Sequence, residues 1–286
     1  MRYFLCLLIV LQISCSEKKE AGKSDLALEK RKTIKINSAD SLKITHYWKQ
    51  ANAVGLYSSM RQKYLDSALQ IKPDSAFFWQ QKAMPLYKAR KYSLGKPFLE
   101  KAAHYDPSGS LDYSGFMKCI FSKEYEESIA DLLEAKKRFG DSYVMDHTYN
   151  FYIGLDYLQL NQFEKAKSYL LKSKEQQFKD FPNDPPHEAC HYLDWFYLGI
   201  VEYELQNFEL AIAHFDMSLK VYENLADAMY FKAICLRNTG KLEAAKMIFE
   251  EALKNNQNTI NEDNVFYEVY PYQIFHKLSP MAREAK

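Results

Sequence analysis

The chain repeats itself at a spacing of 34 residues between Tyr192 and Leu253. When the sequence is aligned at this offset, small residues fall on small residues and large residues on large ones. The matched pairs are Phe196 and Tyr230, Tyr197 and Phe231, Gly199 and Ala233, Ala211 and Ala245, and Phe215 and Phe249. A fixed period of this length is typical of helical hairpins that stack side by side, because each hairpin buries its apolar faces against its neighbours. We therefore expect an open array of hairpins rather than a closed globule.

Weaker copies of the pattern extend the array toward the N-terminus. The predicted hairpin units cover residues 40–73, 74–107, 108–141, 147–180, 192–225 and 226–258. Ala166 and Ala211 hold equivalent places in consecutive units but lie 45 residues apart, 11 more than the repeat length. Prolines within residues 181–186 exclude a helix there, so we expect a loop, or a lengthened second helix followed by a loop. Residues 259–286 are predicted to form a cap over the last unit, interrupted at Pro271, and a tail.

The best-matched units resemble the tetratricopeptide repeat family, whose pattern has an aromatic residue, Leu-Gly, a second aromatic residue, Ala, Phe, Ala and Pro. The residues that carry the resemblance are Trp195, Leu198, Gly199, Ala211 and Phe215 in one unit, and Ala233, Gly240, Ala245, Phe249 and Ala252 in the next. An earlier unit matches at Trp79, Ala83, Gly95, Leu99, Ala102 and Pro107. The resemblance implies an all-α, right-handed superhelical solenoid of about six hairpins with a C-terminal capping segment.

Charge and cysteine content limit the functions that such an array could have. The 286 residues contain 38 Lys and Arg against 37 Asp and Glu, so the chain lacks the basic character of a nucleic-acid-binding protein. The five cysteines show no paired spacing and do not indicate a disulfide framework. The sequence contains no phosphate-binding glycine loop and no nucleophile elbow. We therefore expect no cofactor and no nucleic-acid partner.

The first residues are typical of a secretory signal. Arg2 is followed by an apolar run over residues 3–13, shorter than the roughly 20 residues that a membrane-spanning helix needs. Cys15 follows Ser14, and a polar stretch begins at Ser16. This order resembles a bacterial lipoprotein signal peptide, which implies removal of residues 1–14 and acylation of Cys15, with palmitate among the chains attached. The alternative is an uncleaved or ordinary signal in which Cys15 is incidental.

The stretch after Cys15 predicts a tether. Residues 15–39 are rich in Lys and Glu and contain no aromatic residue, so they bury too little apolar area to fold alone. We expect a flexible polar tether between the lipid and the repeats. In lipoproteins an Asp after the acylated cysteine often retains the protein at the inner membrane, and Ser16 stands there instead. We therefore expect a lipid-anchored protein of the bacterial cell envelope, with the outer membrane favoured over the inner membrane.

A short match to a catalytic motif occurs at residues 187–191, with the sequence His-Glu-Ala-Cys-His. On a helix this spacing places two imidazoles on one face for zinc, with the glutamate as general base. The match follows two prolines, so we expect it to form a first helical turn, and Asp194 and Tyr197 stand where a metzincin extension needs Gly and His. We therefore predict no metal site and no enzyme. A zinc metallopeptidase is kept as an alternative, with candidate residues His187, Glu188 and His191.

The family resemblance also implies a concave groove lined by the first helix of each hairpin. Its predicted lining is aromatic and consists of Tyr87, Tyr113, Phe151, Tyr152, Phe196, Tyr203, Tyr230 and Arg237. Aromatic side chains are favoured anchors at interfaces, because they bury large areas with little loss of rotamer entropy. The main prediction is a membrane-tethered scaffold that binds another envelope protein or a peptide there. Two alternatives stay open: the rings fill gaps between hairpins or meet the chain's own ends, or they serve a glycan or small-molecule binding module.

Overall fold

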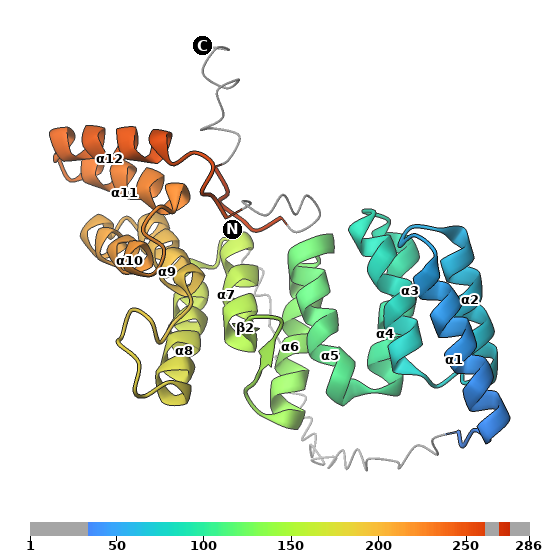
Figure 1. Cartoon of the computed structure of the whole chain (residues 1–286). Coiled ribbons are helices and arrows are strands. Elements are labelled where there is room, and N and C mark those ends of the chain that lie inside the picture. Colours follow the sequence, from blue (N-terminus) through green and yellow to red (C-terminus); the bar gives the residue numbers. More distant parts are fainter. Residues whose placement is uncertain (1–33, 261–268, 275–286) are drawn as a thin grey trace, which may run out of the picture. The chain divides into compact units, whose positions relative to one another are not determined.

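The computed structural model of this protein describes residues 34–260 and 269–274. Within these ranges the chain forms twelve α-helices, one π-helical turn and one short pair of antiparallel strands (Figure 1). The elements are α1 (Ser38–Ala53), α2 (Ser59–Ile71), α3 (Ala76–Lys88), α4 (Tyr92–Tyr105), α5 (Pro107–Met117), η1 (Lys118–Ser122), α6 (Tyr125–Phe139), β1 (Tyr143–Val144), β2 (His147–Thr148), α7 (Tyr149–Gln159), α8 (Phe163–Asp180), α9 (Tyr192–Glu204), α10 (Phe208–Val221), α11 (Ala226–Asn238) and α12 (Leu242–Lys254). The predicted signal peptide, Cys15 and most of the predicted tether lie outside the described residues.

The helices pair in chain order and the pairs stack. Each odd-numbered helix packs against the even-numbered helix that follows it, and each even-numbered helix also contacts the next odd-numbered one. This arrangement confirms the predicted all-α solenoid of stacked hairpins. No helix in the described part of the chain is long and apolar enough to cross a membrane.

A residue in the left-handed region ends the first helix of five hairpins. These residues are Arg90, Lys123, Asn161, Gln206 and Gly240, with φ of 58°, 63°, 55°, 61° and 78°. In four of these hairpins the next backbone N–H reaches back five residues, as from Lys91 to the carbonyl of Leu86 at 2.8 Å. After Lys123 the N–H of Glu124 reaches back six residues, to the carbonyl of Lys118. This pairing uses a carbonyl that the end of a helix leaves without a partner. The second helix of each hairpin therefore starts after a turn of defined shape.

Small residues in the first helices allow the two helices of a hairpin to approach closely. A Cβ atom at Gly199 in α9 would lie 2.5 Å from Cε1 of Phe215 in α10. At Gly154 in α7 it would lie 2.7 Å from Cγ of Leu170 in α8. The pairing of a tiny and a bulky residue, which the sequence repeat predicts, is thus the contact that brings the helices together.

The predicted insertion takes the second of its two expected forms. Helix α8 has 18 residues and extends to Asp180, whereas the other second helices have 13 to 15. Residues 181–191 then connect α8 to α9 without a helix.

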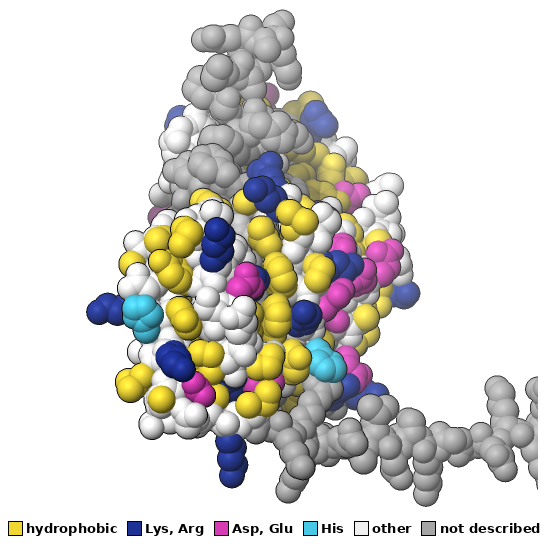
Figure 2. Space-filling model, turned by 90° about the vertical axis from the view of Figure 1, so that its right-hand side faces the viewer, with side chains coloured by type: hydrophobic (Ala, Val, Ile, Leu, Met, Phe, Trp, Pro, Cys, Tyr) yellow, Lys and Arg dark blue, Asp and Glu magenta, His cyan; other side chains and the backbone are white. Residues whose placement is uncertain are grey.

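Two apolar clusters lie inside the stack. The larger one runs from Ala83 to Ile274 and joins most of the hairpins. The smaller one lies among α1, α2 and α3 and contains Ala51, Leu65, Ala68, Leu69 and Phe78. Hydrophobic side chains interspersed with charged ones also cover much of the end of the stack that carries α1 and α2 (Figure 2). This is the end at which a further hairpin would stack in a longer array.

Candidate protein-interaction surface

The first helices α5, α7, α9 and α11 lie next to one another in the stack. Besides their contacts within hairpins, α5 contacts α7, α7 contacts α9, and α9 contacts α11. We call the surface that these four helices form the first-helix surface. The predicted groove residues lie on these helices, except Tyr87, which lies on α3.

Four of the predicted groove residues are buried. Tyr87, Phe151, Tyr152 and Phe196 each have an exposed fraction of 0%. The ring of Phe196 lies 5.9 Å from that of Phe215 in its own hairpin and 6.1 Å from that of Phe231 in the next. These rings fill the space between hairpins, which is one of the two roles that the sequence left open. The prediction that these four residues line an accessible groove is therefore not supported, because a partner could not reach them.

The other predicted groove residues reach the solvent. Tyr113, Tyr203 and Tyr230 are partly exposed, and Arg237 is exposed. Tyr203 on α9 lies against Phe231 on α11, with ring centroids 5.6 Å apart. The structure therefore brings Tyr203, Tyr230 and Arg237 onto two neighbouring helices, whereas Tyr113 lies two hairpins earlier, on α5. These four remain our candidates for partner contact.

Residues 269–274 lie against the first-helix surface and occupy part of it (Figure 1). Their partners include Tyr197 and Glu204 on α9 and Asp227 on α11. The sequence predicts a cap over the last hairpin, a prediction that falls mostly on residues outside those described. The described part of that cap also reaches earlier hairpins. Sequence reasoning missed these contact residues, because each lies at least 47 positions from the residue that it binds.

Asp227 connects two distant parts of the chain to the start of α11. Its side chain is fully buried; Oδ1 accepts the N–H of Ile274 and Oδ2 accepts the N–H of Ile260, each at 2.9 Å. Burial raises the pKa of Asp227 to about 6, against the opposing effect of these two donors. A carboxylate in the first turn of a helix also benefits from the helix dipole. Asp227 therefore acts as a clamp for the chain that follows α12.

A cluster of buried polar side chains joins the start of α7 to α8 and α9. Ser173 Oγ accepts from Thr148 Oγ1 at 2.7 Å and donates to Asp194 Oδ1 at 2.6 Å. His147 stacks on Phe151 with ring centroids 4.0 Å apart, and its Nδ1 lies 3.8 Å from Asp194 Oδ2. The cluster links β2, α7, α8 and α9, so it fixes the hairpin junction beneath the first-helix surface.

Residues 187–191 do not form the predicted first helical turn. They lie in turns between α8 and α9, and His191 is the N-cap of α9, where its Nδ1 accepts the N–H of Leu193 at 3.2 Å. Burial and the neighbouring His147 lower the pKa of His191 to about 4, whereas His187 pairs with Glu188 at 3.3 Å. The two histidines therefore do not share a helix face, which a zincin site requires. Among residues 34–260 and 269–274, no group of three or more His, Cys, Asp or Glu side chains could hold a metal ion.

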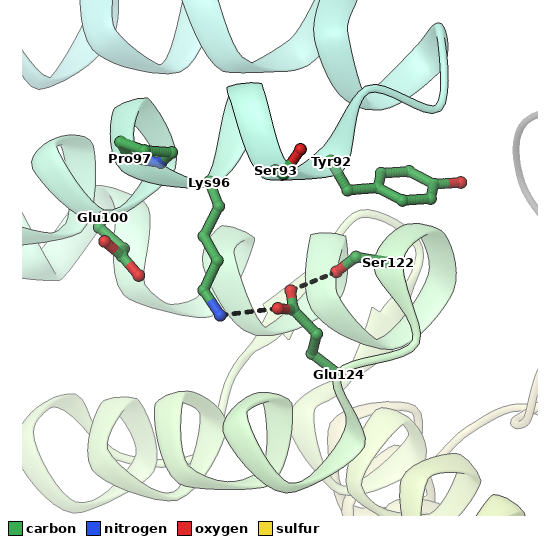
Figure 3. A pocket seen from close by; sticks show the side chains of 7 residues that line it. All are labelled: Tyr92, Ser93, Lys96, Pro97, Glu100, Ser122 and Glu124. Atoms are coloured by element: carbon green, nitrogen blue, oxygen red, sulfur yellow. Dashed lines mark hydrogen bonds and ion pairs between the residues drawn. The ribbon is translucent and has the colours of Figure 1, made fainter.

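A pocket of about 360 Å³ lies between α4 and the segment that joins η1 to α6 (Figure 3). Its lining residues are Tyr92, Ser93, Lys96, Pro97, Glu100, Ser122 and Glu124. Glu124 accepts from Lys96 Nζ and from Ser122 Oγ, each at 2.6 Å. Lys96, Ser122 and Glu124 thus bind one another, and nothing else in the lining favours the alternative of a glycan or small-molecule site.

Residues 226–259 match the family model described as tetratricopeptide repeat. This range covers the hairpin of α11 and α12. Together with the stack of hairpins, the match defines the class of the molecule as a helical-repeat fold of the tetratricopeptide type. A search of curated proteins found no match.

Solved structures with the same arrangement of hairpins are similar over most of this chain. A crystal structure of PilW, described as a widely conserved type IV pilus biogenesis factor, has a TM-score of 0.58 and 17% identity and covers 81% of this chain and 100% of its own. The pilF protein of Pseudomonas aeruginosa has a TM-score of 0.55 and 17% identity, with coverage of 79% and 97%. BtubC from P. vanneervenii has a TM-score of 0.52 and 11% identity, with coverage of 77% and 91%. At these identities the likeness is one of fold.

Proposed function

We propose that this protein is a non-enzymatic interaction scaffold whose first-helix surface binds a protein or peptide partner. The observation that carries the proposal is the segment already on that surface: hydrogen bonds between buried side chains and the backbone of residues 269–274 hold it there. A surface that binds one non-helical segment in this way has the chemistry to bind another. Tyr203, Tyr230 and Arg237 border it and provide the side-chain contacts.

The scaffold is anchored to a membrane of the cell envelope through lipid on Cys15. Support for this comes from the order of Arg2, the apolar run, Ser14 and Cys15, and Ser16 favours the outer membrane. Several acyl chains give stable anchoring, since each buried CH₂ group contributes about 0.8 kcal/mol.

Replacing Cys15 with alanine should abolish lipid attachment. When cells that express the protein are labelled with radioactive palmitate, the wild type should become labelled and Cys15→Ala should not. Cys6→Ala is the matched control, because Cys6 lies in the apolar run that is removed with the signal, and it should label like the wild type. Equal labelling of Cys15→Ala and the wild type would overturn the assignment of Cys15.

Crosslinking from the first-helix surface should capture a partner in living cells. A photo-reactive phenylalanine analogue in place of Tyr230 should give a discrete adduct of larger mass after irradiation, because the side chain at this position on α11 is partly exposed. The adduct is detected by immunoblotting and its attached protein is identified by mass spectrometry.

The control places the same analogue at Leu210, which is 44% exposed on the second helix α10. This position should not give the same adduct. If the adduct forms from Leu210 and not from Tyr230, the partner binds the second-helix side and the proposed surface is wrong.

A further inference from the structure

Residues 269–274 cross the first-helix surface as a short non-helical segment (Figure 1). Lys123 Nζ, after η1, donates to the carbonyl of Val269. The ring of Tyr270 lies 6.4 Å from that of His147, just before α7, and Ile274 binds at the start of α11. The segment's contacts with Tyr197 and Glu204 add α9, so six residues reach four consecutive hairpins.

Buried side chains of the surface bind the backbone of this segment. Tyr197 Oη donates to the carbonyl of Pro271 at 2.9 Å, and Asp227 Oδ1 accepts from the N–H of Ile274 at 2.9 Å. Tyr197 and Asp227 both have exposed fractions of 0%. With the segment in place both groups are shielded from water, which would otherwise compete for these hydrogen bonds. These contacts would serve any non-helical peptide of the same shape.

Two tyrosines on either side of Pro271 supply the specific contacts. The Tyr272 hydroxyl donates to Glu204 Oε1 at 2.6 Å, and its ring lies 5.8 Å from that of Phe231. The Tyr270 ring packs against the same apolar cluster as Tyr272. The segment from Val269 to Ile274 carries no charged side chain. The surface therefore binds an uncharged segment in which a proline lies between two aromatic residues.

The backbone of Tyr272 is strained. Its φ is 62°, a left-handed conformation that bulky residues seldom adopt because Cβ approaches the following carbonyl oxygen. Such a conformation persists where surrounding contacts hold it, and here those contacts are with Glu204 and Phe231. Part of the binding free energy of the segment is thus spent on strain. A peptide that presents the same groups with less strain would bind the surface without this cost.

We propose that residues 269–274 are an internal competitor, and that the partner presents an uncharged non-helical segment in which a proline lies between two aromatic residues. The proposal rests on the proposed function and adds the chemistry of the partner and the regulation of its binding. While the internal segment is bound, the apparent affinity for a partner is reduced by the fraction of molecules whose surface is free. The surface therefore accepts only partners that outcompete the chain itself.

A peptide copying residues 266–278 tests this proposal with the full-length protein. The peptide carries a fluorophore, and its binding is followed by fluorescence anisotropy. The double variant Tyr270→Ser/Tyr272→Ser has a weakened internal segment and an intact surface, so it should bind the peptide at least tenfold more tightly than the wild type. A peptide with serine in place of both tyrosines should not bind either protein. Equal affinity of the two proteins for the copied peptide, or no binding by the double variant, would overturn the proposal.

Two further variants locate the site and control for the substitutions. Adding Glu204→Ala to the double variant should weaken peptide binding again, because Glu204 accepts the Tyr272 hydroxyl. Tyr57→Ser changes an exposed tyrosine in the first hairpin, before α2, and this variant should bind the peptide like the wild type. If the Glu204→Ala variant keeps full affinity, the peptide binds elsewhere.

A photo-reactive analogue in place of Tyr272 provides a measurement that does not depend on the double variant. Irradiation of the purified full chain should give a monomer with a crosslink to α9 or α11. A crosslinked dimer would indicate that two copies exchange their segments. Either this dimer or a monomer without the crosslink would contradict the binding of residues 269–274 to their own chain. If the peptide-binding and Tyr272 crosslinking tests fail but the Tyr230 adduct still forms, only the proposal of an internal competitor is wrong. Loss of the Tyr230 adduct would remove the proposed function itself.

Discussion

Replacing Gly199 with leucine should lower the melting temperature by roughly 6–12 °C, at roughly 2–4 °C per kcal/mol for a chain of this size. A Cβ atom at this position would lie 2.5, 2.7 and 2.9 Å from three ring atoms of Phe215, whose side chain is fully buried. Neither helix can move away without opening the hairpin, so we expect a loss of about 3 kcal/mol, at the upper end of the usual cost of overpacking. Thermal unfolding followed by circular dichroism at 222 nm measures this loss.

The matched control is Gly55→Leu. Gly55 is exposed between α1 and α2, and an added Cβ atom would meet no other atom within 4 Å. We expect its stability to change by no more than about 0.5 kcal/mol. Equal melting temperatures for Gly199→Leu and Gly55→Leu would contradict the close approach of α9 and α10.

Asp156→Asn should make the protein more stable than the wild type at pH 9, by on the order of a few kcal/mol. Asp156 is fully buried in α7. The neighbouring Ser128 hydroxyl and Cys119 thiol donate instead to the carbonyls of Gly115 and Tyr152. The two carboxyl oxygens thus have no hydrogen-bond partner among the described residues, and burial raises the pKa of Asp156 to about 8.

The sign of the pH dependence follows from this raised pKa. In the unfolded chain Asp156 loses its proton near pH 3.8, whereas the folded protein keeps it until about pH 8. Between these values the folded state binds more protons, so the free energy of unfolding falls as pH rises through this window. Asparagine has a similar shape and does not titrate. The stability of the variant relative to the wild type should therefore grow from pH 5 to about pH 8 and level off above it.

Urea denaturation midpoints at pH 5, 7 and 9 measure this difference. Asp227, whose pKa is also raised, is present in both proteins and cancels in the comparison. Asp184→Asn is the control, because Asp184 is exposed in the loop between α8 and α9, and its curve should follow the wild type. A constant difference between Asp156→Asn and the wild type across this range would mean that Asp156 does not titrate there.

The fold could be predicted because its main constraint is periodic and local. Gly199 and Phe215 lie 16 residues apart within one hairpin, and the same small-to-large pairing returns in Gly154 and Leu170. Such a pattern specifies where helices pair, whatever the rest of the chain does. It also placed the insertion after Ala166, although only the structure showed that α8 is lengthened.

The site was harder to predict, because exposure depends on how the next hairpin packs. Phe196 and Tyr203 are both aromatic residues of α9, but Phe196 is fully buried between hairpins and Tyr203 reaches the solvent. Composition and helical spacing do not separate them. In the same way, the amino-acid sequence of residues 187–191 matches the motif of a helical zinc site, but the backbone of these residues forms turns.

The sequence by itself determined the class of fold, the length of its repeat and the place of its insertion, since these follow from side-chain sizes at fixed spacing. Tertiary structure alone decided which rings remain accessible and that residues 269–274 lie on the first-helix surface. Asp227 meets the N–H groups of Ile260 and Ile274, 33 and 47 positions away. Contacts between parts of the chain so far apart have no period, and they form only when the hairpins have stacked and buried the groups that hold them.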